Sequence, residues 1–368
     1  MRRRFDGPRR VAFVLGQYGR GGTETQAQLL VRGLRSRGVD VDVFVVEDGT
    51  GPDGHDFGDA PVTRLGAGRG RGVADASGLC LAAARLGRSL HRRRYHVVHA
   101  ALARAYVLAP VVAPWRHRPH IVVWRRNLGD HLRARQPRTV LDTAAARLSD
   151  VVVANSEAVR RHWVAQGIPA ARTRVIRNAL EPWRFDTVPP RAPDDGTVRL
   201  VTVGGLRPVK GHDVLLAAAG RLAAESVPVE VVVVGDGPRR RALAEQADRL
   251  GVPLVLPGHQ ADPRPWLAAG TVYVHPSHSE GASNAIAEAM AQGCAVVATD
   301  VGGAAEMLGP DGLLVRPGDV SGLAATLRTV IADPDLRRDL GERARGRARA
   351  LFAMDQVIDQ HLDVYAGG

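Results

Sequence analysis

The sequence of 368 residues predicts an α/β protein with two domains, each built on a parallel sheet. Three observations support this prediction: β-rich runs alternate with helical patterns along the chain, glycine turns follow several of these runs, and a Pro- and Asp-rich tract at 181–197 has no hydrophobic periodicity. We therefore place an N-terminal domain at 1–185, a C-terminal domain at 195–350 and a last helix at 351–368. Ligands of parallel sheets bind outside the carboxyl ends of the strands, so functional residues are expected in the turns that follow strands.

The composition is that of a water-soluble chain, because apolar residues make up 45% of it and no apolar run is long enough to span a membrane. The basic N-terminus precedes a run, VAFVL, that is too short for a signal peptide, and we interpret this run as the first strand. Cys80 and Cys294 lie far apart in the sequence and predict neither a disulfide nor a metal site. A reducing cytoplasm is the expected location.

The charge is distributed unevenly. Residues 1–190 contain 32 arginines and 16 acidic residues, a net charge of +16, whereas residues 191–368 have a net charge of −4. An excess of Arg over Lys is typical of GC-rich genomes, but it does not explain why acidic residues balance it in only one half. The first half therefore favours an anionic partner. Few aromatics, 4% of residues, and no recognisable nucleic-acid motif argue against nucleic acid as that partner.

The first domain shows strand and helix patterns in alternation. Strands are expected at 10–15, 41–46, near 62, and at 95–100, 120–124, 150–155 and 174–178, with helices after the first strand to about Gly38 and at 74–94, 136–148 and 156–166.

Several polar residues of this domain follow strands. Gly21 and Gly22 let the backbone approach a ligand at the start of the first helix, and Glu24 follows them. His99 ends a strand, where a histidine is as often structural as it is in contact with substrate. Arg125 and Arg126 follow another strand, and an arginine there can bind phosphate or carboxylate but cannot act as a base near neutral pH. A solvated pair of arginines is the alternative.

The second domain begins with a strand at 198–203 and the turn GGLRPVKG. Arg207 and Lys210, the one lysine of the chain, lie three residues apart in this glycine-bounded loop, so both side chains can reach one anionic group. Strands at 230–234 and 253–259 follow, the first of them ending in a turn with Gly235 and Gly237. Residues 313–368 are expected to form helices, the last of them amphipathic.

The stretch from 271 to 306 is predicted as strand, loop, helix, strand and glycine turn, with the helix at 283–292 ended by Gly293. Glu280 in the loop and Glu288 in the helix are at most about 12 Å apart along a helix, so one ligand could contact both. The backbone N–H groups of 281–284 open this helix and can hold sugar hydroxyls and a phosphate. An acidic first turn with a solvated Glu288 is the alternative.

The run EGASNAIAEAMAQGCAVVATDVGG within this stretch resembles the donor-site signature of family 4 of the retaining nucleotide-sugar glycosyltransferases. Their GT-B fold has two facing Rossmann-like domains with parallel sheets and a C-terminal helix that crosses back to the first domain. The sequence departs from the family at Ala282, where an aromatic is usual, and at Cys294-Ala295, where Pro often precedes the strand. The smaller Ala282 could enlarge the sugar pocket.

The resemblance implies a retaining hexosyltransferase that uses a nucleotide sugar, which we expect to be UDP-linked, and requires neither a metal nor another cofactor. Arg207, Lys210 and Glu280 are the implied catalytic residues, although Gly205 occupies the usual position of the arginine, so Arg207 is displaced from the family register. The implied donor-binding residues are Gly21, Gly22, Gly205, Gly235, Gly237, His259, Gly281, Ala282, Ser283, Asn284 and Glu288. The candidate acceptor-binding residues are Glu24, His99, Arg125 and Arg126, one of the two arginines replacing a histidine that many relatives have there.

The expected acceptor is anionic or lipid-linked and is met at the cytoplasmic membrane face, with a soluble acceptor as the alternative. The arginines proposed to face it are Arg92, Arg93, Arg94, Arg116, Arg118, Arg125, Arg126, Arg133, Arg135 and Arg138. Two other functions are alternatives. One is a nucleic-acid-binding protein. The other is a nucleotide-sugar epimerase of the same fold, for whose acid/base chemistry the sequence offers only His99 and Glu24. The Asp-x-Asp triplets at 40–42 and 333–335 lie far from the glycine turns and are expected to be structural.

Overall fold

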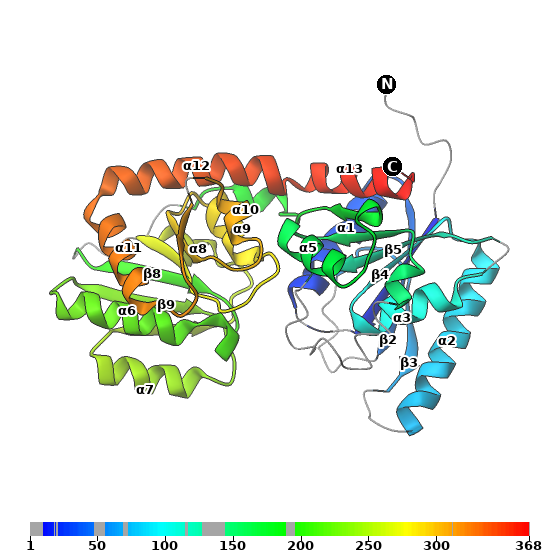
Figure 1. Ribbon diagram of the computed structural model, residues 1–368, viewed down its shortest axis with the longest axis horizontal. Helices are drawn as coiled ribbons and strands as arrows, with labels where there is room; N and C mark the ends of the chain where they lie inside the picture. Colours follow the sequence, from blue (N-terminus) through cyan, green and yellow to red (C-terminus); the bar gives the residue numbers. More distant parts are fainter. Residues whose placement is uncertain are drawn as a thin grey trace. The chain divides into compact units, whose positions relative to one another are not determined.

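The computed structural model describes residues 10–17, 19, 21–47, 56–68, 73–114, 117–126, 144–188, 196–310 and 312–367. The chain divides into two compact units, Met1–Ala179 with Met354–Gly368 (unit 1) and Leu180–Ala353 (unit 2). Each unit has one sheet, and the pairings between the described strands are parallel (Figure 1).

The sheet of unit 1 has seven strands in the order β3-β2-β1-β4-β5-β6-β7. The strands are β1 (Arg10–Gln17), β2 (Asp40–Glu47), β3 (Val62–Ala67), β4 (Val97–Ala101), β5 (His120–Arg125), β6 (Val151–Ala154) and β7 (Thr173–Val175). The strand order reverses between β1 and β4, because β2 and β3 extend the sheet on one side of β1 while β4 to β7 extend it on the other. A ligand of such a sheet binds outside the carboxyl ends at this reversal.

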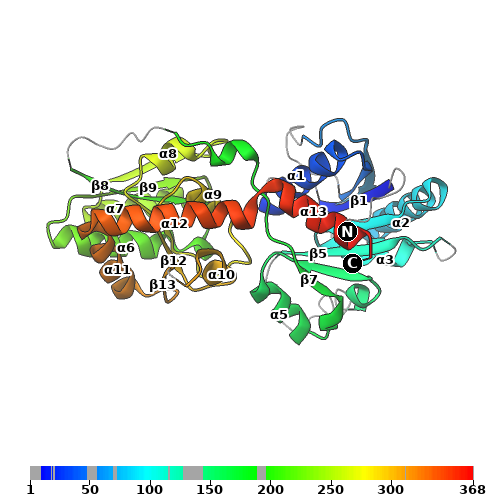
Figure 2. The same cartoon turned by 90° about the horizontal axis from the view of Figure 1, so that it is seen from above.

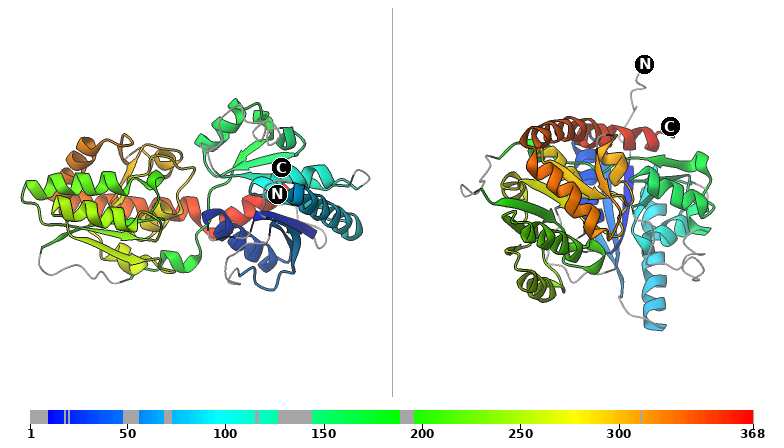
Figure 3. Two further views of the ribbon diagram at one scale, coloured as in Figure 1. Left: turned by 90° about the horizontal axis from the view of Figure 1, so that it is seen from below. Right: turned by 60° about the vertical axis from the view of Figure 1, so that its left-hand side comes forward.

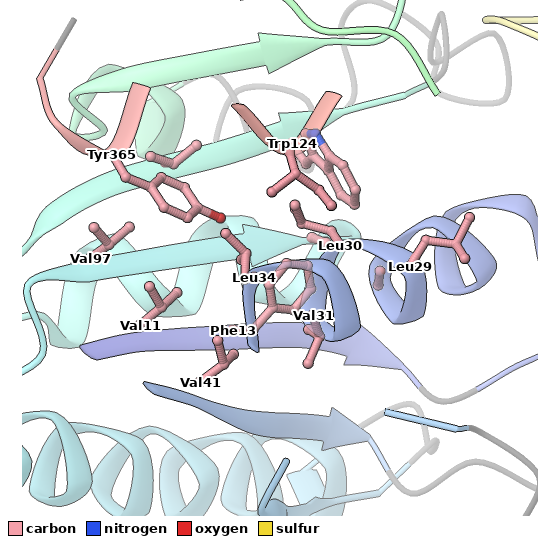
Figure 4. Packing of buried hydrophobic residues seen from close by; sticks show 14 of the residues in the cluster. Val11, Phe13, Leu29, Leu30, Val31, Leu34, Val41, Val97, Trp124 and Tyr365 are labelled. Carbon is pink, nitrogen blue, oxygen red and sulfur yellow. The ribbon is translucent and has the colours of Figure 1, made fainter. Parts of the chain in front are cut away.

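Alternate residues of the central strands face opposite layers of helices. Val11 and Phe13 pack under α1 (Gly22–Ser36) and α13 (Met354–Tyr365). Ala12 and Val14 pack under α2 (Val73–Arg93) and α3 (Ala103–Val112). Figure 4 shows the first layer, with Leu30 and Leu34 of α1 over Phe13 and with Tyr365 of α13 beside them. The helices are α1 (Gly22–Ser36), α2 (Val73–Arg93), α3 (Ala103–Val112), α5 (Glu157–Ala165) and α13 (Met354–Tyr365), with a short 3-10 helix η1 (Ala170–Arg172).

The sheet of unit 2 has six strands in the order β10-β9-β8-β11-β12-β13. They are β8 (Val198–Val203), β9 (Val229–Val234), β10 (Leu254–Gly258), β11 (Val272–His275), β12 (Val296–Thr299) and β13 (Leu313–Val315). The helices are η2 (Pro182–Phe185), η3 (Pro208–Lys210), α6 (His212–Ala224), α7 (Arg240–Leu250), α8 (Arg264–Ala268), α9 (Asn284–Ala291), α10 (Ala304–Leu308), α11 (Val320–Ala332) and α12 (Pro334–Phe352).

The helices of unit 2 cover both faces of its sheet. Residues of α6, α7 and α11 pack with Val231 and Val233 of β9, while residues of α8, α9, α10 and α12 pack with Val232 and Val234. Figure 2 shows α12 along one face of this sheet, and the left view of Figure 3 shows α6 and α7 on the opposite face. Among the described residues, no helix combines the length and the apolar content that a membrane crossing requires.

Helix α3 and strand β13 are among the elements that differ from the sequence prediction, and most of the helix predicted at 136–148 lies outside the described residues. Residues 103–112 form α3, which was not predicted because this apolar run has little helical periodicity and contains Pro110 near its end. Residues 313–315 form the strand β13 beside β12, although the prediction placed helices from 313 onward. A strand of three residues is too short to produce a recognisable alternation.

The boundary between the units also differs from the predicted one. The second unit begins at Leu180, whose N–H donates to the carbonyl of Phe352 over 2.8 Å, whereas the prediction kept residues up to 185 in the first domain. The side-chain Nε2 of Gln292 donates hydrogen bonds to the carbonyl oxygens of Arg184 and Asp186, over 2.6 and 3.1 Å. These bonds tie 180–186 to unit 2.

The last helix, α13, belongs to unit 1. Its Asp355 and Asp359 pair with Arg37 at the end of α1, at 2.7 and 2.5 Å. Gly33 allows the close packing of the two helices, because a Cβ there would lie 2.1 Å from Ile358 Cδ1. The chain thus returns to unit 1 after completing unit 2.

Candidate active site

Two charged side chains meet at the carboxyl edge of the unit 2 sheet. Lys210 lies in the loop after β8, and Glu280 lies in the loop between β11 and α9. Because β8 and β11 are neighbours, both loops leave the same edge of the sheet. The ammonium of Lys210 forms an ion pair with the carboxylate of Glu280, and the two side chains remain 24% and 19% exposed. Both groups therefore remain within reach of a ligand.

A buried polar network supports Glu280 from behind. His275 Nε2 lies 3.4 Å from Glu280 Oε1 and 3.1 Å from Ser277 Oγ, and His275 Nδ1 lies 3.3 Å from the hydroxyl of Tyr273. Burial acts to raise the pKa of Glu280, but His275 and Lys210 outweigh it and bring the pKa to about 2. Burial lowers the pKa of His275. Glu280 is thus an ionised hydrogen-bond acceptor at neutral pH.

Glycines let the loops at this edge pack backbone against backbone. A Cβ at Gly235 would lie 2.0 Å from the carbonyl oxygen of Gly204, and one at Gly302, whose φ is +56°, would lie 2.0 Å from the carbonyl oxygen of Glu280. Gly237 is equally restricted, with Leu206 O 2.7 Å from its added Cβ. The loops after β8, β9, β11 and β12 therefore form one compact layer.

Gly205 is different from these glycines. An added Cβ there would meet only the carbonyl oxygen of Asp236, at 3.6 Å, which is ordinary van der Waals contact. The fold therefore does not require a glycine at this position, where the family has an arginine.

The amino end of α9 opens at the same edge. The helix begins at Asn284, one residue later than predicted, and its N-cap residue Ser283 makes no side-chain capping bond. Gly281 and Ser283 are buried, whereas Ala282 and Asn284 are half-buried. Arg207 and His259, from the turns after β8 and β10, have exposed side chains.

Glu288 lies on α9 with 17% of its side chain exposed, and its Oε1 is 3.7 Å from Nη1 of Arg184. Burial raises the pKa of Glu288, Arg184 acts against this, and Asp262 and Glu181 add to it. The sequence prediction missed Arg184, because it lies in the tract interpreted as a linker. The signal that could have identified it is the Trp-Arg-Phe run at 183–185 within an otherwise polar tract.

In unit 1, the predicted residues Gly21, Gly22 and Glu24 lie at the start of α1, where Gly21 is the N-cap. The carboxylate of Glu24 folds over Gly21, since a Cβ there would lie 2.5 Å from Glu24 Oε2. Glu24 is buried. A side chain at position 21 would therefore require the Glu24 carboxylate to shift.

Arg126 is a buried cation at the carboxyl end of β5, with 8% exposure. Its Nη2 donates to Asn178 Oδ1 over 2.6 Å, and its guanidinium carbon lies 4.5 Å from the ring centroid of Trp124. Its Nη1 is buried and has no hydrogen-bond partner among the described residues. Burial lowers the pKa of Arg126 to about 10, while Tyr106 and Glu24 oppose this. The charge of Arg126 is thus weakly compensated.

Arg125 points elsewhere. Its guanidinium carbon lies 4.0 Å from the ring centroid of Tyr106 and 4.2 Å from that of Trp163, and its side chain is buried. Of the two arginines between which the sequence did not decide, the structure brings Arg126 close to Glu24 and packs Arg125 between aromatic rings.

His99 lies in the core of unit 1, with 0% exposure. Its Nδ1 is 2.6 Å from the hydroxyl of Tyr365, and its ring stacks on Phe13 with centroids 4.7 Å apart. Burial lowers the pKa of His99 well below its usual value, so the ring is neutral. The predicted contact with acceptor is therefore replaced by a structural role. This burial also removes one of the two acid/base residues that an epimerase would need.

The proposed arginine surface is smaller than predicted. Arg125 and Arg126 are buried, Arg93 pairs with Asp42 at 2.6 Å, and Arg118 pairs with Asp150 at 3.0 Å. Arg92 and Arg94 are exposed. The remaining members of the set, Arg116, Arg133, Arg135 and Arg138, lie outside the described residues.

Both Asp-x-Asp triplets have structural partners. Asp42 lies in β2 and accepts hydrogen bonds from Tyr95 and Arg93, while Asp333 caps α12 by accepting from the N–H of Leu336 over 2.9 Å. In the part of the chain that the structure describes, no group of three or more His, Cys, Asp or Glu side chains is arranged to hold a metal ion.

Two family models and several known proteins match the chain. A glycosyl transferase 4-like domain matches residues 21–179, and a domain of the glycosyl transferases group 1 matches residues 197–333. The lipopolysaccharide core biosynthesis glycosyltransferase LpsE of Rhizobium meliloti is 34% identical over 178 residues, which cover 47% of this chain and 51% of LpsE. The D-inositol 3-phosphate glycosyltransferase of Nocardioides sp. is 31% identical over 257 residues, which cover 62% of this chain and 56% of that enzyme.

The match therefore spans little more than half the length of each of these relatives. The crystal structure of Anabaena Alr3699/HepE in complex with UDP is 22% identical and superimposes with a TM-score of 0.83, covering 98% of this chain and 100% of HepE. Together with the two parallel sheets, these matches identify the fold as GT-B. The chain belongs to the glycosyltransferases of this fold, in which a glycosyl transferase 4-like domain precedes a group 1 domain.

Proposed function

We propose that the protein transfers a hexose from a UDP-linked sugar to an acceptor hydroxyl in the biosynthesis of a glycan, a glycolipid or a glycosylated metabolite. The observation that carries this proposal is the pairing of Lys210 with Glu280 at the carboxyl edge of unit 2. An ammonium is suited to a diphosphate, and an ionised carboxylate is suited to sugar hydroxyls. The likeness to HepE, whose structure contains UDP, and to LpsE, an enzyme of lipopolysaccharide core biosynthesis, supports it.

Departure of the nucleoside diphosphate is the step that this site must assist. The C1–O bond to the diphosphate breaks, and negative charge develops on the leaving phosphate. Lys210 supplies a fixed cation at that position, and the exposed Arg207 can add a second one. With this charge supplied by side chains, we expect the reaction to proceed without a metal ion.

Retention of the anomeric configuration is part of the proposal. The acceptor oxygen attacks C1 from the face that the diphosphate leaves, and the acceptor proton passes to the departing phosphate. Glu280 is a weak base because its pKa is about 2, and His275 beside it is buried. These properties favour the phosphate over the protein as the proton acceptor.

An anionic or lipid-linked acceptor is proposed for unit 1. Arg126 offers a buried guanidinium with an Nη1 that lacks a hydrogen-bond partner within the described ranges, and a phosphate or carboxylate would satisfy it. One relative is a D-inositol 3-phosphate glycosyltransferase, which supports a phosphorylated acceptor. The exposed Arg92 and Arg94 would favour peripheral contact with anionic lipid at the cytoplasmic face of a membrane.

The experiment that tests this function is a thermal-shift screen of nucleotide sugars, followed by NMR of the product formed from the best donor. We expect UDP-hexoses to stabilise the protein, turnover to survive EDTA, and the product to keep the anomeric configuration of the donor. An inverted product would contradict retention, and a requirement for Mg²⁺ would contradict the roles of Arg207 and Lys210. Sedimentation with liposomes of graded anionic lipid content tests the membrane contact, which should decrease with added salt.

A further inference from the structure

Arg184, in η2 of unit 2, approaches the carboxylate of Glu288. The two side chains are 15% and 17% exposed, and the distance from Arg184 Nη1 to Glu288 Oε1 is 3.7 Å. This distance is that of an ion pair and is longer than a hydrogen bond. The guanidinium carbon of Arg184 also lies 4.1 Å from the ring centroid of Trp183, which limits where the side chain can move.

Three helices hold the backbone around Arg184. Gln292, which follows α9 four residues after Glu288, donates to the carbonyl oxygen of Arg184 over 2.6 Å. Arg264 of α8 donates to the carbonyl oxygen of Trp183 over 2.7 Å, and Arg345 of α12 donates to that of Phe185 over 3.1 Å. The position of Arg184 relative to α9 is therefore fixed by the fold and does not depend on the long ion pair alone.

The other charged groups near Glu288 are either acidic or already paired with a carboxylate. Asp262 and Glu181 are acidic, and Arg264 is bound to Asp262 by two nitrogens, Nε and Nη2. Tyr273, on β11, has a pKa raised well above its usual value by burial and remains neutral. Among the described residues, Arg184 is thus the cation that favours the ionised form of Glu288.

We propose that Arg184 is a positioning residue for the donor nucleoside, which keeps the Glu288 carboxylate ionised and oriented to accept hydrogen bonds from the ribose hydroxyls. This inference rests on the proposed function and on the resemblance, which implies that Glu288 belongs to the donor site and holds the ribose hydroxyls. A vicinal diol donates two hydrogen bonds, and an ionised carboxylate accepts both, whereas a protonated carboxyl group loses part of this capacity. Since Arg184 Nη1 stays beyond hydrogen-bond distance, both carboxylate oxygens remain available for the ribose.

Removing the charge of Arg184 should make donor binding depend more strongly on pH. Glu288 is ionised above its pKa, and without Arg184 that pKa rises further, so binding is lost at a higher pH as the solution is acidified. At high pH the carboxylate is ionised with or without Arg184, so the difference between the proteins should shrink. A pKa increase of about one unit corresponds to a roughly tenfold weaker affinity at the acidic end.

The test is calorimetric titration of the full-length protein and its variants with UDP and with 2′-deoxy-UDP between pH 5.5 and 8. We expect Arg184→Gln to weaken UDP binding about tenfold at pH 5.5 and much less at pH 8. At low pH the variant should lose its preference for UDP over the 2′-deoxy analogue. Arg184→Lys should restore the wild-type pH profile. The matched control is Arg328→Gln. Arg328 is an exposed residue of α11 that pairs with Glu225, and this variant should bind UDP as the wild type does.

A double-mutant cycle separates positioning from a structural role. In a Glu288→Gln background, Arg184→Gln should have no further effect on UDP affinity, because the carboxylate on which it acts is gone. Equal weakening at every pH with the 2′-deoxy discrimination intact would overturn the inference in favour of a scaffold role. Unchanged UDP binding in Arg184→Gln would overturn the inference alone, whereas no UDP binding by the wild type would overturn the proposed function with it.

Discussion

Polar residues lie at or near the carboxyl ends of strands in both sheets, but their burial and their pairing differ. In unit 2, Lys210 and Glu280 are paired with each other and remain partly exposed. In unit 1, His99 is the middle residue of β4 and is buried in the core, and Arg126, which follows β5, is buried without an ion-pair partner among the described residues. A polar residue at or near the carboxyl end of a strand is therefore not always exposed to a ligand.

The cause of the difference is the element that packs against these residues. In unit 1, α13 returns from the end of the chain and places Tyr365 on His99, 266 residues away in sequence. In unit 2, the loops at the edge pack on one another through Gly235 and Gly302, and this layer leaves Lys210 and Glu280 partly exposed. The environment of a polar residue near the end of a strand is therefore decided by its tertiary partner.

The largest effect is expected at Lys210. Lys210→Ala should lower turnover at least about 10²-fold, comparable to losing one strong electrostatic donor at the leaving group. The measurement is kcat with a saturating UDP-hexose. Arg241→Ala, which removes an exposed guanidinium from α7 of the same unit, is the control and should retain activity. Wild-type turnover in Lys210→Ala would contradict the assignment of the unit 2 edge to the diphosphate.

The next largest effect tests the packed loops of unit 2. Gly302→Ala should destabilise this unit by more than about 2 kcal/mol, because the added Cβ meets the carbonyl of Glu280 and the backbone is left-handed. Gly251→Ala is the matched control: Gly251 has a φ of +63° but nothing within 4 Å of an added Cβ, so only about 1 kcal/mol should be lost.

Hydrogen exchange of the β12 amides under native conditions would measure both glycine variants. Equal losses would mean that backbone conformation alone, and not the close approach of the loops, requires Gly302.

The sequence predicted the strand, loop and helix at the unit 2 edge because their determinants are local. Strand, loop and helix from 271 to 292 follow one another directly, so Glu280, Glu288 and the start of α9 lie in one short stretch of the chain. His99 could not be assigned in the same way, because its burial depends on Tyr365, and Arg184 was hidden in a tract that resembles a linker. Helix α3 and strand β13 were missed because the first lacks periodicity and the second is three residues long.

The third prediction concerns the pH dependence of unit 1. Burial lowers the pKa of His361, which contacts His99 and Trp124, to about 4. The unfolded chain, with a histidine pKa of about 6.5, binds more protons between these values, so the free energy of unfolding falls as the pH decreases through this window. The contribution of His361 lost between neutral pH and pH 5 is about 2 kcal/mol.

His361→Leu should therefore reduce the slope of unit 1 stability against pH, measured by hydrogen exchange of the β1 and β4 amides. The variant also loses the bond from His361 Nδ1 to the carbonyl of Val357, an effect that does not depend on pH. His91→Gln changes an exposed histidine on α2 and should leave the slope intact. An unaltered slope in His361→Leu would contradict the account of the buried ring.

The smallest effect is expected at Arg126, whose buried guanidinium forms no ion pair with a carboxylate among the described residues. Arg126→Met should leave the stability of unit 1 unchanged or raise it by about 1 kcal/mol, because replacing a desolvated ion with an apolar chain of similar volume is often neutral or stabilising. Arg104→Met is the contrast, since Arg104 pairs with Glu47 at 2.5 Å and its loss leaves a half-buried carboxylate without this cation. If Arg126 serves an anionic acceptor, the ratio of kcat/KM for a phosphorylated acceptor to that for its unphosphorylated analogue should fall about tenfold, as for one lost charge-assisted hydrogen bond. UDP affinity should not change, because the charged residues proposed to bind the diphosphate, Arg207 and Lys210, lie in unit 2. A loss of stability equal to that of Arg104→Met would instead mean that Arg126 is held by the fold as firmly as the paired cations are, and the two edges would then be alike.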